Sequence, residues 1–292
     1  MKNCKLTWLI FGHRGWIGQQ VIGELTHMGQ EILTTEVRAD DGVGVYDVIT
    51  RLKPDRVISL LGRTHGEGSS TIDYLEQKGK LVENVRDNLF APVTIANVCM
   101  QLHVHFTYLG TGCIFTYDEH HTTQDGFKET SAPNFFGSSY SVVKGFTDRL
   151  MGQMPGVLNV RIRMPITADY HPRNFITKIT SYDKICSYPN SMTVLPELIP
   201  LMLDMSLHAK TGTINLTNPG VISHNEILQM YRDIVDPDFC WKNFSEEEQR
   251  LVIASDRSNN YLDTSKLQQL YPQVKNITES IKDVLHKMKN NL

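Results

Sequence analysis

The feature that most constrains the fold is a short apolar run followed by three evenly spaced glycines. Residues 5–11 end at Gly12, and Gly15 and Gly18 follow. Apolar residues then recur at helical spacing as far as Gly29, which predicts a strand, a tight turn and a helix. Glycines at such a junction let backbone N–H groups approach a pyrophosphate, which also meets the positive end of the helix. The pattern therefore predicts a dinucleotide site.

The same alternation continues through the first half of the chain. The further predicted elements are strands near 31–37, 56–61, 104–109 and 158–163, and helices at about 87–101 and 138–152. Strands that alternate with helices indicate βαβ units and a parallel sheet. We therefore expect an α/β fold with a Rossmann-type, doubly wound parallel sheet, and we expect residues 1–164 to form the cofactor-binding domain.

The second half of the chain has a different pattern. From Pro165 onward prolines recur and the periodicity becomes irregular. We expect residues 165–292 to form mainly a smaller, substrate-binding domain, with a segment near 212–216 returning to the main sheet. The last quarter is predicted to be helical, because Ser223 and Glu226 have the spacing of a capping box.

Composition narrows the classes of partner. The 292 residues are 40% hydrophobic and 21% charged, which excludes a disordered chain. The formal net charge is -3 and no long basic run occurs, so we expect no nucleic acid and no membrane surface as a partner. The longest apolar stretch, residues 195–207, is broken by prolines and acids and falls short of the ~20 residues of a membrane span. With strand-like sequence at the N-terminus in place of a signal peptide, we expect a cytoplasmic protein.

Five cysteines are widely spaced, with no C-x-x-C pair: Cys4, Cys99, Cys113, Cys186 and Cys240. This pattern favours neither a disulfide framework nor a zinc site, and we expect no metal. Four of the cysteines are interpreted as inert core residues. Cys113 differs because of the residues near it.

The residues around the glycine loop bear on which dinucleotide binds. Arg14 lies inside the loop, and Glu36 and Arg38 stand at the end of the second predicted strand. An acidic residue there would bond a ribose 2′-hydroxyl, whereas an arginine accommodates a 2′-phosphate. Two guanidinium groups outweigh one carboxylate, so the sequence favours NADP(H), with Trp16 and Ile17 completing the cofactor loop. The alternative is that Glu36 and Arg38 are only solvated.

A candidate catalytic group follows from the Y-x-x-x-K pair Tyr140 and Lys144 in a predicted helix. Residues four apart share a helical face, so we expect the ammonium to lie near the phenol and to lower its pKa from ~10. Tyr140 would then be a proton donor at neutral pH. Thr111 follows the strand at 104–109 and stands at the carboxyl end of the sheet, where α/β sites form. Cys113, two residues on, points to the same side if the backbone is extended.

Several longer segments carry a more specific pattern. They are Gly-Thr-Gly-Cys-Ile-Phe at 110–115, Arg-Met-Pro-Ile at 163–166, Pro-Arg-Asn-Phe-Ile-Thr-Lys-Ile at 172–179, Pro-Asn-Ser-Met-Thr-Val-Leu at 189–195 and Asn-Pro-Gly-Val-Ile-Ser-His-Asn-Glu-Ile-Leu at 218–228. With Tyr140 and Lys144, they resemble the nucleotide-rhamnose synthase/epimerase-reductase family over nearly the whole chain. That family belongs to the extended short-chain dehydrogenase/reductases and converts UDP-4-keto-6-deoxy-D-glucose to UDP-L-rhamnose with NADPH.

The resemblance implies two reactions in one site. Epimerisation at C3 and C5 needs acid/base groups on both faces of the sugar, and the family's cysteine and lysine match Cys113 and Lys178. The reference pKa values of these groups, ~8.5 and ~10.4, mean that their surroundings must tune them. Reduction at C4 then uses Tyr140 as the proton donor, Lys144 to orient the cofactor ribose and Thr111 to hold the oxygen, and Tyr140 and Lys144 are both expected to contact the cofactor. From the residues alone, Lys178 would be interpreted as an exposed lysine.

Further polar residues are candidates for binding. Arg173, Asn174, Arg257 and Asn260 are expected to bind the pyrophosphate or uracil of the sugar nucleotide, with surface salt bridging as the alternative. Asn88, in the helix before the candidate catalytic strand, is expected to bond backbone near the cofactor unless it is an ordinary surface amide.

Partners and alternative functions complete the expectations. Only one Rossmann module is present, so a separate 4,6-dehydratase is expected to supply the keto sugar. UDP and dTDP both remain open as the nucleotide, and family analogy favours a homodimer. The alternatives are a 4-keto-reductase alone, like dTDP-4-dehydrorhamnose reductases, or a non-catalytic NADP-binding regulatory subunit. Cys113 and Lys178 argue against the first, and Thr111, Tyr140 and Lys144 against the second.

Overall fold

The computed structural model describes residues 5–68, 71–245, 248 and 255–291. The chain divides into two compact units, each assembled from separate stretches. Unit 1 consists of Met1–Ile114, Ala132–Arg161 and Ile199–Ile214, and unit 2 consists of Phe115–Ser131, Ile162–Leu198 and Asn215–Leu292. The expected boundary after residue 164 lies close to the change of unit at Arg161 and Ile162. The other changes of unit have no counterpart in the sequence pattern.

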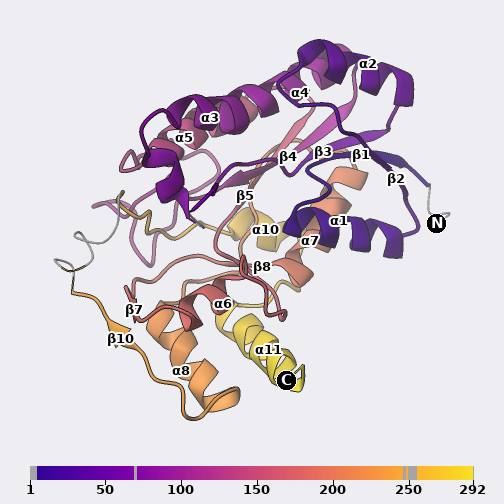
Figure 1. The fold of residues 1–292 in the computed structure, drawn as a ribbon. Coiled ribbons are helices and arrows are strands. Elements are labelled where there is room, and N and C mark those ends of the chain that lie inside the picture. Colours follow the sequence, from indigo (N-terminus) through magenta and orange to yellow (C-terminus); the bar gives the residue numbers. More distant parts are fainter. Residues whose placement is uncertain (1–4, 69–70, 246–247, 249–254, 292) are drawn as a thin grey trace. The chain divides into compact units, whose positions relative to one another are not determined.

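Unit 1 is built on a six-stranded sheet in the order β2-β1-β3-β4-β5-β9 (Figure 1). The strands are β1 (Thr7–Phe11), β2 (Glu31–Thr34), β3 (Arg56–Ser59), β4 (His105–Thr111), β5 (Val157–Ile162) and β9 (Gly212–Asn215). β1 pairs in parallel with β2 and β3, and β3 pairs in parallel with β4. The strand order reverses between β1 and β3, and doubly wound sheets bind ligands at such a switch point, beyond the carboxyl ends of the strands.

Helices cover both faces of this sheet (Figure 1). On one face lie α2 (Gly42–Leu52), α4 (Ala91–Gln101) and α5 (Ser139–Met151), and on the other lie α1 (Trp16–His27) and the end of α7 (Leu195–Leu207). Leu9, Val57 and Phe106 of the strands pack with apolar residues of α2 and α4. Strands buried on both faces are mostly apolar, and runs of this kind indicate β1 and β3 in the sequence. Helix α2 was not predicted, because glycines at its start resemble a loop; the Asp41 carboxylate caps it by accepting from the Gly44 N–H at 3.1 Å.

The helix expected at 87–101 is longer than predicted and contains a π turn. It begins as α3 (Leu81–Val85), widens in the π turn η2 (Arg86–Phe90) and continues as α4. The Thr147 hydroxyl of α5 donates to the Asn88 carbonyl at 2.7 Å and so bonds a carbonyl within this irregular turn. Such turns are rare and are frequent at functional sites.

Unit 2 has its own core of helices and short strands. Its elements are β6 (Pro165–Ile166), α6 (Phe175–Thr180), β7 (Lys184–Ile185), β8 (Thr193–Val194), α8 (His224–Ile234), β10 (Lys242–Asn243), α10 (Ser265–Leu270) and α11 (Ile277–Asn290). Apolar residues of α6, α8 and α11 form one cluster. The capping box predicted at Ser223 and Glu226 is confirmed at the start of α8. Among the residues that the structure describes, no helix is long and apolar enough to cross a bilayer.

Candidate active site

The glycine loop between β1 and α1 has the backbone that the sequence predicts. Gly12 has φ of +86°, and a Cβ there would lie 3.1 Å from the carbonyl carbon of Leu60. A Cβ on Gly18 would overlap the Gly12 carbonyl oxygen and lie 2.9 Å from that of His13. Gly15 caps α1 without a side-chain hydrogen bond, and no acid stands in the first turn. The N–H groups of that turn therefore suit an anion.

We expect Gly18→Ala to lower the free energy of unfolding by roughly 1–3 kcal/mol, because backbone must move to relieve the overlap. Gly23→Ala in the same helix is the matched control. A Cβ at Gly23 meets nothing within 4 Å, and alanine in a helix interior gains about 0.5–1 kcal/mol over glycine. Urea denaturation of the two variants measures both values. Equal loss of stability in both would contradict the tight packing argued for Gly18.

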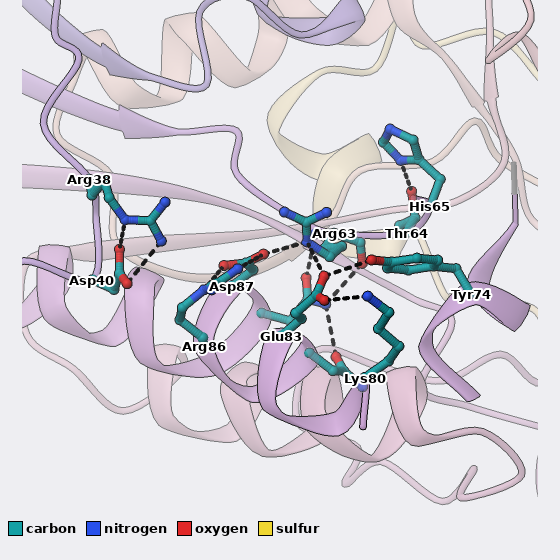
Figure 2. A network of polar contacts seen from close by, with 12 residues as sticks. Arg38, Asp40, Arg63, Thr64, His65, Tyr74, Lys80, Glu83, Arg86 and Asp87 are labelled. Atoms are coloured by element: carbon teal, nitrogen blue, oxygen red, sulfur yellow. Dashed lines mark hydrogen bonds and ion pairs between the residues drawn. The ribbon is translucent and has the colours of Figure 1, made fainter. Parts of the chain in front are cut away.

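The two arginines expected near the 2′ position of the cofactor each face a carboxylate. Arg14 donates to Glu36 at 2.6 Å, and Arg38 pairs with Asp40 at 3.0 Å (Figure 2). The hydrogen bond from Arg38 lowers the pKa of Asp40. Both guanidinium groups are well exposed, and exposed ion pairs contribute little to stability. Each arginine can therefore exchange its carboxylate for a phosphate at small cost.

A polar network holds the segment that follows β3 (Figure 2). Arg63 in this segment forms ion pairs with Asp87 and, at 3.8 Å, with Glu83. Glu83 also accepts hydrogen bonds from the Tyr74 hydroxyl at 2.8 Å and from Lys80 at 2.6 Å. Hydrogen bonds that involve a charged group are stronger than hydrogen bonds between neutral groups. The network therefore ties the segment at the switch point of the sheet to the 3-10 helix η1 (Ile72–Glu76) and to α3.

Asn88 in the π turn fixes the backbone of the same segment. Its carboxamide accepts from the Arg63 N–H at 2.9 Å and donates to the Arg63 carbonyl at 2.9 Å. It also donates to the Asn84 side chain at 2.9 Å. The amide therefore bonds backbone, as the sequence predicts, and it is fully buried rather than on the helix surface.

Thr111, Cys113 and Tyr140 lie together at the carboxyl end of β4. The Cys113 N–H donates to the Thr111 hydroxyl at 3.0 Å, and the Thr111 hydroxyl is also hydrogen-bonded to Tyr140. Ser141 donates to the Cys113 carbonyl at 2.7 Å, which joins the start of α5 to the turn after β4. The Tyr140 ring packs in an apolar cluster with Tyr74, against which Cys113 also packs.

Glu76 anchors the helix that carries Tyr140, and the sequence analysis missed it. The Glu76 carboxylate accepts from the Ser139 N–H at 2.8 Å and from its hydroxyl at 2.9 Å. Ser138 caps the same turn by accepting from the Ser141 N–H at 3.1 Å. A carboxylate is stabilised at a helix N-terminus by the helix dipole. No spacing signal identified Glu76, because it lies 63 residues before Ser139.

Lys144 is buried and reaches past Tyr140 into the sheet. Its ammonium donates to the hydroxyl of Tyr108 on β4, another residue that the sequence analysis missed. Burial lowers the pKa of Lys144 to about 8. A buried ammonium needs a hydrogen-bond acceptor, and Tyr108 supplies one below the site.

The pKa of Tyr140 moves in the direction opposite to the prediction. Burial raises it, the negative charge of a Cys113 thiolate raises it further, and the hydrogen bond with Thr111 offsets only part of the rise. The prediction that Lys144 lowers the pKa of this phenol is therefore wrong here, because the ammonium bonds Tyr108 instead. Tyr140 consequently stays protonated at neutral pH and is an acid rather than a base.

Lys178 stands on α6 in unit 2 and is only partly exposed. Burial lowers its pKa, and the neighbouring charge of Arg173 lowers it further. The amine is therefore closer to the range in which it exchanges protons at neutral pH than an exposed lysine is.

Asn174 has a structural place in unit 2 rather than a binding one. Its carboxamide accepts from the N–H groups of Thr167 and Ile176, both at 3.3 Å. It donates to the carbonyls of Thr167 at 3.0 Å and Asp169 at 2.8 Å. Both of its N–H groups and both lone pairs are used. Asn174 therefore builds the turn before α6, and through it the position of Lys178.

The other three residues expected at the substrate differ in their surroundings within unit 2. Asn260 is fully buried and donates to the Phe115 carbonyl at 2.9 Å and to the Ser258 hydroxyl at 3.0 Å. Arg257 is partly exposed and donates to the Ser255 hydroxyl at 2.8 Å. Arg173 is exposed. The two arginines are therefore better placed than the two asparagines to meet a diphosphate.

Comparisons with known proteins show which proteins the chain is similar to. The chain is 55% identical to the L780 UDP-rhamnose synthase of Acanthamoeba polyphaga mimivirus; the match to its crystal structure covers 98% of this chain and 100% of that one, with a TM-score of 0.95. It is also 43% identical to a bifunctional dTDP-4-dehydrorhamnose 3,5-epimerase/dTDP-4-dehydrorhamnose reductase of Arabidopsis thaliana. That match covers 96% of this chain and 92% of the relative. A trifunctional UDP-glucose 4,6-dehydratase/UDP-4-keto-6-deoxy-D-glucose 3,5-epimerase/UDP-4-keto-L-rhamnose-reductase of the same plant is 41% identical over 94% of this chain, which spans 41% of that relative. No family model matches the sequence.

Proposed function

The chain belongs to the nucleotide-rhamnose synthase/epimerase-reductase family, and on this premise we propose that it converts UDP-4-keto-6-deoxy-D-glucose to UDP-L-rhamnose with NADPH. The observation that carries the proposal is the group formed by Thr111, Cys113 and Tyr140 at the carboxyl end of β4. A reductase needs the hydroxyl and the phenol. The thiol beside them is the additional group that an epimerase needs.

Residues around the glycine loop suit the cofactor. The uncapped first turn of α1 meets the pyrophosphate, with Gly12, Gly15 and Gly18 giving backbone access and Trp16 and Ile17 flanking it. Arg14 and Arg38 exchange their carboxylates for the 2′-phosphate. The network around Arg63 and Asn88 holds the neighbouring segment at the switch point in place.

Epimerisation is assigned to Cys113 and Lys178. A proton α to the 4-keto group leaves to one of them, and the other returns a proton on the opposite face of the ring. The carbonyl accepts the negative charge of the enolate, and Thr111 and Tyr140 donate hydrogen bonds to that oxygen. Arg173 and Arg257 bind the diphosphate of the substrate, and Asn174 and Asn260 position their neighbours.

Reduction at C4 is assigned to Tyr140, Thr111 and Lys144. When bound, NADPH supplies the hydride for C4. Tyr140 gives its proton to the C4 oxygen, Thr111 holds that oxygen, and the Lys144 ammonium orients the cofactor ribose. A phenol that stays protonated at neutral pH suits this step, because a sugar alkoxide is far more basic than a phenolate.

Cys113 and Tyr140 are linked by charge as well as by position. A negative charge at Cys113 raises the pKa of Tyr140 and so favours the protonated phenol that the reduction uses. Both groups are held by the same turn, because Ser141 next to Tyr140 bonds the Cys113 carbonyl.

The test of the proposed function is product identification. The purified protein is incubated with UDP- or dTDP-4-keto-6-deoxyglucose and with NADPH or NADH, and the sugar formed is identified by NMR and mass spectrometry. We expect UDP-L-rhamnose with NADPH. A 6-deoxy sugar with unchanged configuration at C3 and C5 would leave only the reductase function. No product from either nucleotide sugar would exclude the enzyme function.

Glu36 is expected to set the preference between the two cofactors. We expect Glu36→Gln to raise the ratio of kcat/KM for NADPH to that for NADH by about tenfold, because the carboxylate that pairs with Arg14 and repels a 2′-phosphate becomes a neutral amide. Glu31→Gln is the control, since Glu31 is exposed at the start of β2, whereas Glu36 lies two residues beyond the end of that strand. A ratio that changes equally in both variants would contradict this role.

Partners follow from the same chemistry. A 4,6-dehydratase must supply the keto sugar, and the trifunctional relative carries such an activity in its own name.

We also propose a homodimer in the cytoplasm. Large apolar side chains stay exposed on neighbouring helices of unit 1, Val82 and Phe90 on the α3–α4 helix and Phe146 and Leu150 on α5, and such patches are typical of protein interfaces.

A further inference from the structure

Tyr108 is a buried phenol that none of the roles assigned above uses. It lies on β4, three residues before Thr111, and its ring belongs to the core between the sheet, α2 and α4. Its side chain is fully buried. Burial raises its pKa well above the usual value, and the charges of Tyr140 and Asp148 act in the same direction. The phenol therefore stays neutral and acts through its hydroxyl and through its ring, whose centroid lies 4.7 Å from the Lys144 ammonium.

The contact that Tyr108 makes is with Lys144. The lysine ammonium donates to the Tyr108 hydroxyl, and the lysine side chain is only 3% exposed. The titratable groups that act on this ammonium are Tyr108 on β4, which it bonds, Cys113 after β4 and Asp148 on α5 itself. Asp148 is already paired with Arg161 at 2.7 Å.

We propose that Tyr108 is a positioning residue for the reduction, which holds the Lys144 ammonium charged and directed at the base of the site by accepting its hydrogen bond. The inference rests on the proposed reductase function. An ammonium has three N–H donors, so one bond to Tyr108 leaves the group able to bond the cofactor ribose at the same time. A buried cation without such an acceptor loses its proton more readily.

The test is Tyr108→Phe, which removes one oxygen and keeps the ring. The wild-type rate of reduction is expected to fall as pH rises through about 8, where Lys144 loses its proton. In Tyr108→Phe, this fall of kcat/KM at high pH, the alkaline limb of the profile, is expected to move about one pH unit lower. The reason is that the charged form of Lys144 has lost a hydrogen bond. The KM for the keto sugar is expected to stay the same. Titration of the lysine 13Cε signal, assigned with Lys144→Arg, measures the same shift without turnover.

Phe106→Leu is the matched control, because Phe106 lies on the same strand and in the same core cluster and carries no hydroxyl that could accept a bond from Lys144. It is expected to lower the melting temperature and to leave the alkaline limb in place. An unchanged limb and an unchanged Lys144 titration in Tyr108→Phe would overturn the inference, as would an equal shift in Phe106→Leu. A wild-type protein that oxidises no NADPH with either keto sugar would overturn the proposed function, while the lysine titration would still decide the Tyr108 contact.

Discussion

Replacing Tyr140 by Phe is expected to slow NADPH oxidation by about 10²–10⁴-fold, the usual contribution of a positioned proton donor. The phenol is the group that protonates the C4 oxygen in the proposed reduction, and Phe keeps the ring in its apolar cluster with Tyr74 and Leu75. The measurement is the steady-state rate with a 4-keto sugar already inverted at C3 and C5, so that epimerisation does not limit it.

Two controls separate a chemical role of Tyr140 from a structural one. NADPH binding, followed by cofactor fluorescence, is expected to be nearly unchanged in Tyr140→Phe, because the glycine loop lies elsewhere on unit 1. Tyr46→Phe, on the exposed side of α2, is expected to keep the full rate. An undiminished rate in Tyr140→Phe would exclude this phenol as the proton donor of the reduction.

Cys113→Ala is expected to abolish inversion at C3 and C5 while reduction of a pre-inverted 4-keto sugar continues. The thiol is the acid/base group on one face of the sugar in the proposed mechanism, and alanine has no proton to exchange. NMR in D2O follows both the entry of deuterium and the configuration of each carbon. Exchange that persists with retained configuration would identify Lys178 as the group that removes the proton.

Cys99→Ala is the matched cysteine control. Cys99 is buried in the core of unit 1, where burial raises the pKa of its thiol, so it stays protonated and takes no part in exchange. This variant is expected to lose some stability through a small cavity and to keep inversion intact. Unchanged inversion in Cys113→Ala would leave a reductase without epimerase activity as the better description of the protein.

Much of the fold was predictable because local chemistry determines it. The strand before Gly12 is apolar on both faces and the glycine spacing allows one backbone path, so β1, the loop and α1 follow from sequence alone. Helix α2 was not predictable, because Gly42 and Gly44 at its start have low helix propensity. The helix forms because Asp41 caps it and because its apolar residues pack on the sheet. Tertiary contacts override weak propensity in such segments.

The candidate site was predictable where motifs are local and was missed where contacts are distant in sequence. Tyr140 and Lys144 share a helix, and Thr111 and Cys113 share a turn. For Tyr108 the sequence predicts only a place in an apolar strand, because nothing in the sequence indicates that the Lys144 side chain reaches it. The substrate role expected for Asn174 likewise gives way to the four hydrogen bonds that only the folded turn shows.

The π turn at Arg86–Phe90 makes the number of residues in this helix matter as much as their identity. Each residue advances a helix by about 100°, so deleting one residue here would turn the π turn into regular α-helix. The deletion would also rotate Asn88 away from Arg63, whose backbone N–H and carbonyl it bonds. A design that transfers this nucleotide site to another scaffold would therefore have to keep the extra residue of the π turn as well as the glycines. An alignment by residue type would not identify that extra residue as part of the site.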